Sequence, residues 1–164
     1  IPTTMWLALG DALAVALLKA RGFNKDDFGA IHPGGKLGAA LKRVRDLMRV
    51  GEGDPLIGPD TSVPDTLAAI SRVGIGAAGV VENGRLIGIV TDGDLRRKLT
   101  REMFDRSARE LMTANPMPIA PEAPIADAVQ IMNSKRITIL FAVDEEGRPV
   151  GVVHMHDALG ARVR

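Results

Sequence analysis

The stretch Gly88–Asp94 reads GIVTDGD, and a near copy, GVVHMHD, occupies Gly151–Asp157, 63 residues further along the chain. A second landmark shows the same relation, because RDLM at Arg45–Met48 returns as RELM at Arg109–Met112, 64 residues later. Landmarks that recur in one order at nearly one offset indicate an internal repeat. The 164-residue chain is therefore expected to contain two copies of one structural unit.

Local patterns in the first copy predict the order strand, helix, strand, strand, helix. After a proline-rich extended piece, Ser62 precedes an apolar-periodic run that predicts a short helix capped by this serine. The β-rich runs Ala77–Val81 and Leu86–Val90 flank Asn83-Gly84, a dipeptide typical of antiparallel hairpins. The second helix is expected to start at Thr91.

The second copy repeats this pattern, with a helix near Ile125–Ser134, strands at Ile139–Val143 and Val150–Val153, and a helix from about His156. A unit of roughly 55 residues buries too little surface to be stable alone. We therefore expect the two copies to pack face to face with pseudo-twofold symmetry. Such packing leaves clefts between the units, where small ligands usually bind.

Composition excludes several classes of partner. The net charge is +1 and aromatic residues make up 3% of the chain, which argues against nucleic acid as a partner. The absence of cysteine excludes disulfides, thiolate zinc sites and cysteine nucleophiles. The most apolar stretch, Met5–Leu18, is shorter than the roughly 20 residues that a bilayer span requires, so no membrane span is predicted.

The repeated endings resemble those of a tandem pair of cystathionine-β-synthase-type (CBS) domains. Upstream, GDALAVALL at Gly10–Leu18 and HPGGKLG at His32–Gly38 resemble the end of the sugar-isomerase (SIS) domain of bacterial arabinose-5-phosphate isomerases. The resemblance implies an α+β, or α/β, fold in which two β-α-β-β-α repeats follow a helical SIS remnant. The expected boundaries are 1–42 for the SIS remnant, 43–104 for the first CBS domain and 105–164 for the second.

The resemblance also implies a function. Isomerases of this family interconvert D-ribulose 5-phosphate and D-arabinose 5-phosphate in the cytoplasm, for the synthesis of Kdo and lipopolysaccharide. This chain is expected to be a regulatory and assembly module of such an enzyme and to be inactive alone. The implied partners are a small nucleotide effector and further copies of the chain, as a homodimer through the CBS pairs and a tetramer in the parent enzyme.

Thr91 and Asp94 admit two interpretations. A threonine followed three positions later by an acidic residue resembles a capping box. The same residues at a helix N-terminus suit a nucleotide, because N–H groups there face a phosphate and Asp94 can accept hydrogen bonds from ribose hydroxyls. In CBS domains generally the matching Thr and Asp bind phosphate and ribose, and the resemblance implies these roles here. Arg96 and Arg97 either balance phosphate charge or are solvated helix residues.

The second copy keeps the acid, as Asp157, but has His154 in place of the hydroxyl residue, so its cleft is expected to differ from the first. His154 and His156 share a strand face, yet without an obvious third ligand beyond Asp157 no metal site is predicted. The implied effector of the clefts is AMP, ATP or CMP-Kdo, and no cofactor is required.

His32, in the HPGG turn, matches a histidine implicated at the isomerase active site, where proton transfer between carbons and oxygens needs an acid or base. No other member of that catalytic set can be matched. The run Leu7–Leu18 is apolar on nearly every side, so its helix is expected to be buried in an oligomer. The alternative function is a purely structural CBS pair that fixes the quaternary arrangement without a ligand.

Overall fold

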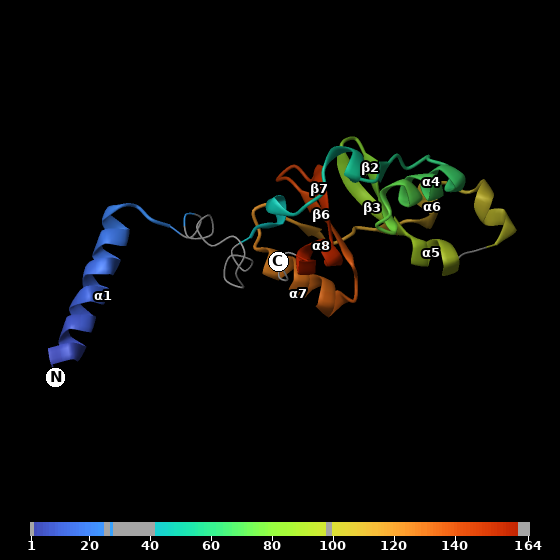
Figure 1. Ribbon diagram of the computed structural model, residues 1–164. Coiled ribbons are helices and arrows are strands. Elements are labelled where there is room, and N and C mark those ends of the chain that lie inside the picture. The colour runs from blue at the N-terminus through green and yellow to red at the C-terminus, as the bar shows by residue number, and fades with distance from the viewer. Residues whose placement is uncertain (1, 25–26, 28–41, 98–99, 161–164) are drawn as a thin grey trace.

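The computed structural model describes residues 2–24, 27, 42–97 and 100–160. Two small mixed sheets form the middle of the molecule, and each is built around an antiparallel hairpin (Figure 1). The first sheet has the order β1-β2-β3-β4, with β1 parallel and β3 antiparallel to β2. Its strands are β1 (Leu56–Ile57), β2 (Ala77–Glu82), β3 (Arg85–Thr91) and β4 (Thr113–Ala114).

The second sheet has the order β5-β6-β7 and repeats the pairing of the first, parallel and then antiparallel. Its strands are β5 (Pro118–Ile119), β6 (Ile139–Val143) and β7 (Pro149–His154). Both hairpins carry a register shift at matching places, between Val80 and Val81 and between Ala142 and Val143. The two sheets are therefore related in detail, as the pseudo-twofold prediction requires.

Helices complete each repeat in the predicted order of strand, helix, strand, strand, helix. In both repeats the helix before the hairpin has 11 residues and the helix after it has six. The α-helices are α1 (Pro2–Ala20), α4 (Val63–Val73), α5 (Asp92–Arg97), α6 (Ala108–Leu111), α7 (Ile125–Lys135) and α8 (Met155–Gly160). Short 3-10 turns occupy Val44–Asp46, Gly51–Gly53 and Arg101–Asp105.

Two sequence signals act as predicted in the first repeat. The Ser62 hydroxyl accepts a hydrogen bond from the Asp65 N–H at 3.2 Å and so caps α4. Asn83 and Gly84 both have positive φ, at 50° and 78°, which gives the hairpin turn the twist that its strands need. Local chemistry at these residues therefore sets the start of α4 and the register of β2 against β3.

Each repeat is completed by the segment that precedes the other repeat. Residues 43–49, which include RDLM, lie against the second sheet, where Arg49 pairs with Val152. The matching segment 107–114, which includes RELM, lies against the first sheet, and its last residues form β4. This exchange links the repeats, because each sheet pairs with a segment from the other half of the chain.

Glycines allow the exchanged segments to approach the hairpins closely. A Cβ atom at Gly151 would lie 2.9 Å from the Arg49 carbonyl oxygen and 2.8 Å from Met48 Sδ. At the matching position, a Cβ at Gly88 would lie 2.8 Å from Met112 Cγ. The glycine that opens each repeated motif is thus a packing requirement, because the methionine of the exchanged segment rests directly on it.

Three apolar clusters form the core. Val44 joins the cluster of the second repeat and Leu111 that of the first, as the exchange of segments requires. The third cluster lies where the two hairpins meet and is centred on Phe141, which is 1% exposed. A Cβ on Gly79 would lie 2.9 Å from the Phe141 ring, so this glycine admits the aromatic side chain between the repeats.

Helix α1 is longer than the apolar run Met5–Leu18, because it continues over 19 residues. Its segment Thr3–Ala20 has a mean hydropathy of 1.3 and extends about 27 Å, so by length and composition it is a candidate span. Every side chain at positions 3–20 is exposed, which leaves its apolar surface uncovered in the single chain.

Candidate functional site

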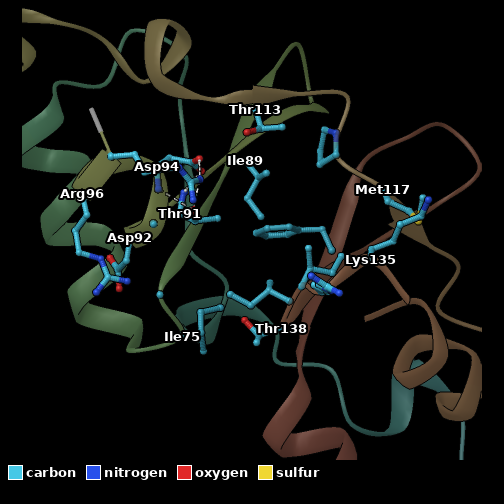
Figure 2. A pocket seen from close by; sticks show the side chains of 18 of the residues that line it. Ile75, Ile89, Thr91, Asp92, Asp94, Arg96, Thr113, Met117, Lys135 and Thr138 are labelled. Atoms are coloured by element: carbon cyan, nitrogen blue, oxygen red, sulfur yellow. Dashed lines mark hydrogen bonds and ion pairs between the residues drawn. The ribbon is translucent and has the colours of Figure 1, made fainter. Parts of the chain in front are cut away.

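A cavity of about 680 Å³ lies between the two repeats, beside the end of β3 (Figure 2). Thr91 and Asp94 line it on the side of the first repeat, and Lys135 and Met117 lie on the opposite side. Apolar side chains of the facing hairpins, such as Ile89 and Phe141, form part of the wall. The cavity therefore joins the repeated motif of one copy to the α7–β6 connection of the other.

Thr91 and Asp94 are held together by reciprocal hydrogen bonds. The Thr91 hydroxyl and N–H donate to Asp94 Oδ2 at 2.6 Å and 3.1 Å, and the Asp94 N–H donates to Thr91 Oγ1 at 3.2 Å. This is the geometry of a capping box with Asp in place of the usual Glu or Gln. These hydrogen bonds confirm the local prediction from the sequence, a helix cap at the start of α5.

Arg97 adds a charged contact to this pair. Its guanidinium donates to Asp94 Oδ1 at 2.6 Å, and Asp94 is 8% exposed. Burial raises the pKa of Asp94, but the hydrogen bonds from Thr91 and Arg97 lower it by more, so its pKa lies below the usual range. Asp94 is therefore a fixed carboxylate at the cavity wall.

Three further cations line the cavity. Arg96 comes from α5, whereas Lys135 and Arg136 come from the C-terminal end of α7 in the other repeat. All three side chains are exposed, and none forms an ion pair with a described residue. Sequence reasoning selected Arg96 and Arg97 but missed Lys135 and Arg136, because basic residues at a helix C-terminus are usual as partners of the helix dipole.

The matching residues of the second repeat are built differently. Asp157 accepts two hydrogen bonds from Arg49 of the exchanged segment, at 2.8 Å from Nε and 3.1 Å from Nη2. His154 Nδ1 accepts from the His156 N–H at 3.3 Å, and burial lowers the pKa of His154, assisted by the charge of His156. The 680 Å³ cavity includes none of these side chains, so the structure does not bring the six predicted effector residues together at one place.

His32 lies outside the described residues. Among the described residues, no group of three or more His, Asp or Glu side chains is arranged to hold a metal ion.

Both repeats match a known protein family. The family model described as CBS domain matches residues 44–101 and again residues 108–164. The arabinose 5-phosphate isomerase KdsD of Pseudomonas aeruginosa is 46% identical over 165 residues, an alignment that covers 98% of this chain and 51% of that protein. The chain thus spans about half the length of the curated relatives it matches.

Solved structures share the fold. CBSX2 in complex with AMP aligns with a TM-score of 0.64 at 24% identity, over 73% of this chain and 94% of that chain. The CBS domain pair of MJ0100, in complex with methylthioadenosine and S-adenosyl-L-methionine, aligns with a TM-score of 0.66 at 22% identity, over 73% and 94%. At these identities the likeness concerns the fold alone. The repeats, their pairing and the matched residues together show that the chain belongs to the CBS domain family, with two copies of the domain in tandem.

Proposed function

We propose that this chain is the regulatory CBS module of an arabinose-5-phosphate isomerase and that it binds a nucleotide or nucleotide-sugar in the cavity between its repeats. The observation that carries the proposal is the cavity itself, which places the ionised Asp94 and several cations around an apolar wall. The AMP held by CBSX2 and the adenosine derivatives held by the MJ0100 pair support a nucleoside-containing ligand.

Each part of a nucleotide has a suitable place in this cavity. Asp94 Oδ1 accepts a hydrogen bond from Arg97 and keeps a lone pair for a ribose hydroxyl. The guanidinium of Arg96 and the cations of α7 suit phosphate oxygens. The base packs against apolar side chains such as Ile89 and Phe141. A ligand held in this way contacts both repeats and so stabilises their mutual arrangement.

The second repeat is proposed not to bind a nucleotide at its matching position. Arg49 already holds both carboxylate oxygens of Asp157, and the imidazole of His154 stands where Thr91 offers a small hydroxyl. A ligand there would have to displace a bidentate ion pair, which is costly because it leaves charges without partners. The proposal therefore assigns Thr91, Asp94, Arg96 and Arg97 to the effector and gives His154 and Asp157 a structural role.

Thermal unfolding with AMP, ATP and CMP-Kdo tests this proposal. A ligand that binds only the folded state raises the melting temperature with concentration, by about 5–10 °C at a hundredfold excess over Kd. The shift is expected for at least one of the three ligands and should be lost in Asp94→Ala. Silence of the wild-type chain toward all three would instead support the purely structural CBS pair, for which the closed Thr91–Asp94 capping box is a sufficient role.

The enzymatic context follows from the relatives. We propose that the parent protein interconverts D-ribulose 5-phosphate and D-arabinose 5-phosphate in the cytoplasm for Kdo and lipopolysaccharide synthesis. The name of the Pseudomonas aeruginosa relative supports this proposal. Residues 1–42 are proposed to be the end of the SIS domain, with His32 serving the parent active site, while 43–104 and 105–164 are the CBS domains. The chain alone is proposed to be inactive.

Helix α1 is proposed to be covered by another copy of the chain. Its large apolar side chains are 44–71% exposed, which is an unfavourable surface for a helix in water. These side chains are Met5, Trp6, Leu7, Leu9, Leu13, Val15, Leu17 and Leu18. Multi-angle light scattering of the full chain is expected to give a dimer or a larger assembly. A monomer at micromolar concentration would contradict this proposal, and sedimentation with lipid vesicles would point to a membrane instead.

A further inference from the structure

Arg136 has a backbone conformation that is unusual for its residue type. It ends α7 with φ 55° and ψ 43°, in the left-handed region that favours glycine. The end of the matching helix α4 has the same conformation, but there the residue is Gly74, with φ 70°. The two repeats thus share the helix ending, and only the second has a bulky side chain at a position that suits glycine.

The backbone around Arg136 requires this conformation. The Arg136 N–H donates to the Asn133 carbonyl at 3.3 Å, and the Ile137 N–H reaches back to the Met132 carbonyl at 2.9 Å. Bonds of this kind close a helix through a left-handed residue, which is most often glycine. Glycine at position 136 would keep the same hydrogen-bonded ending at lower strain, and Lys135 already places a cation in the last turn for the helix dipole, so helix termination does not explain the arginine. A strained residue at a ligand cavity is instead typical of a functional requirement.

The charges around the cavity show what the arginine contributes. The lining has four cations, Arg96 and Arg97 from the first repeat and Lys135 and Arg136 from the second. Two carboxylates also line the cavity, Asp92 and Asp94, and both belong to the first repeat, where Asp94 is paired with Arg97. The lining charges of the first repeat therefore balance, and the excess of positive charge lies at Lys135 and Arg136 on the other side of the cavity. A single phosphate next to the ribose at Asp94 lies on the balanced side, whereas a chain of phosphates can extend from there to the two cations.

We propose that Arg136, together with Lys135, is a specificity-determining residue that selects nucleoside polyphosphates over monophosphates and uncharged nucleosides. This inference rests on the proposed nucleotide site and adds to it the charge class of the ligand. The ribose is held at Asp94, and the terminal phosphates reach the α7 end of the cavity. The strain at position 136 is retained because a glycine would remove the cation that the terminal phosphate needs.

Titration calorimetry with ATP, AMP and adenosine tests this inference on the wild-type chain, Arg136→Gly and Arg136→Lys. Wild type is expected to bind ATP at least tenfold more tightly than AMP. Arg136→Gly should weaken ATP by about tenfold, which is the effect of one lost charged hydrogen bond, and should leave adenosine unchanged. Arg136→Lys should keep most of the ATP affinity. Arg72→Gln removes the positive charge of an exposed α4 residue that does not line the cavity, and is the matched control.

The melting temperature without ligand is a second readout, and Arg136→Gly should raise it while lowering the affinity for ATP. Without ligand, Arg136→Gly should melt about 2–4 °C above wild type, because glycine relieves the left-handed strain. Weaker ATP binding in a more stable protein cannot come from misfolding. If nucleotides bind the wild-type chain but ATP has no advantage over AMP, or Arg136→Gly binds ATP as wild type does, the inference is wrong while the nucleotide site stands. If no nucleotide binds the wild-type chain, both are wrong.

Discussion

Gly151→Ala is expected to lower the free energy of unfolding by about 2–3 kcal/mol, in the upper range for overpacking a close contact. The new Cβ would lie 2.9 Å from the backbone carbonyl oxygen of Arg49, and a carbonyl within a strand pairing cannot move aside as a side chain can. The strain falls on the exchanged segment that completes the second sheet. Urea unfolding at pH 7 measures the change.

Two glycines serve as controls for this experiment. Gly160→Ala adds the same methyl group at the end of α8, where no described residue lies within 4 Å of the new Cβ, so its free energy of unfolding should be unchanged or slightly higher. Gly88→Ala meets the side chain of Met112 and not a carbonyl, so its loss should be smaller than that of Gly151→Ala. A Gly151→Ala protein as stable as Gly160→Ala would contradict the proposed close packing of the exchanged segment.

Asp54→Asn is expected to raise the free energy of unfolding by about 2 kcal/mol at pH 7 and to leave it nearly unchanged near pH 4. Burial raises the pKa of Asp54 to about 6, and its Oδ1 atom is buried without a hydrogen-bond partner among the residues that the structure describes. The folded chain therefore holds a proton here that the unfolded chain releases at lower pH. Stability from this group is present below the unfolded value of 3.8 and falls as pH rises to about 6.

The measurement is the difference in free energy of unfolding between Asp54→Asn and wild type, taken by urea at pH 4, 5, 6 and 7. Taking the difference cancels the titration of all other carboxylates. The gain should grow between pH 4 and 6 and then level off. A difference that does not depend on pH, or one that shrinks as pH rises, would show that burial does not raise the pKa of Asp54. Asp60→Asn, at an exposed position, supplies a surface comparison.

The sequence predicted the elements of the fold well where the determining chemistry is local. Ser62 and the Asn83-Gly84 turn act through neighbours a few residues away, so their effect can be inferred without the structure. The exchange of segments could not be inferred in this way. RDLM has the same local pattern whether it packs on its own repeat or on the other. Long-range hydrogen bonds distinguish the two, such as those from Arg49 to Val152 and from Val44 to Ala123.

The candidate site also depends on both local and long-range contacts, and only the local ones can be predicted from the sequence. Thr91 and Asp94 belong to one motif, and their mutual hydrogen bonds follow from their spacing. Lys135 and Arg136 lie in the other repeat, and nothing nearby in the sequence connects them to Thr91. One signal was available, because the alignment of the repeats places Arg136 opposite Gly74, where a left-handed residue ends the helix. A repeat that replaces such a glycine by arginine indicates a role for the side chain.

The length of helix α1 is harder to predict from the sequence. Its most apolar run ends at Met5 and Leu18, although a helix also includes flanking residues of lower hydropathy. Length estimated from composition alone was therefore too short.

We expect a nucleotide to bind between the repeats at Asp94 and not at its counterpart Asp157. Calorimetric titration of ATP into wild type, Asp94→Ala and Asp157→Ala tests it most directly, because the two variants remove matching carboxylates. We predict one ATP per chain in wild type, no binding in Asp94→Ala, and binding retained in Asp157→Ala. Two equivalent ATP molecules per chain, or ATP binding that survives in Asp94→Ala, would contradict the account.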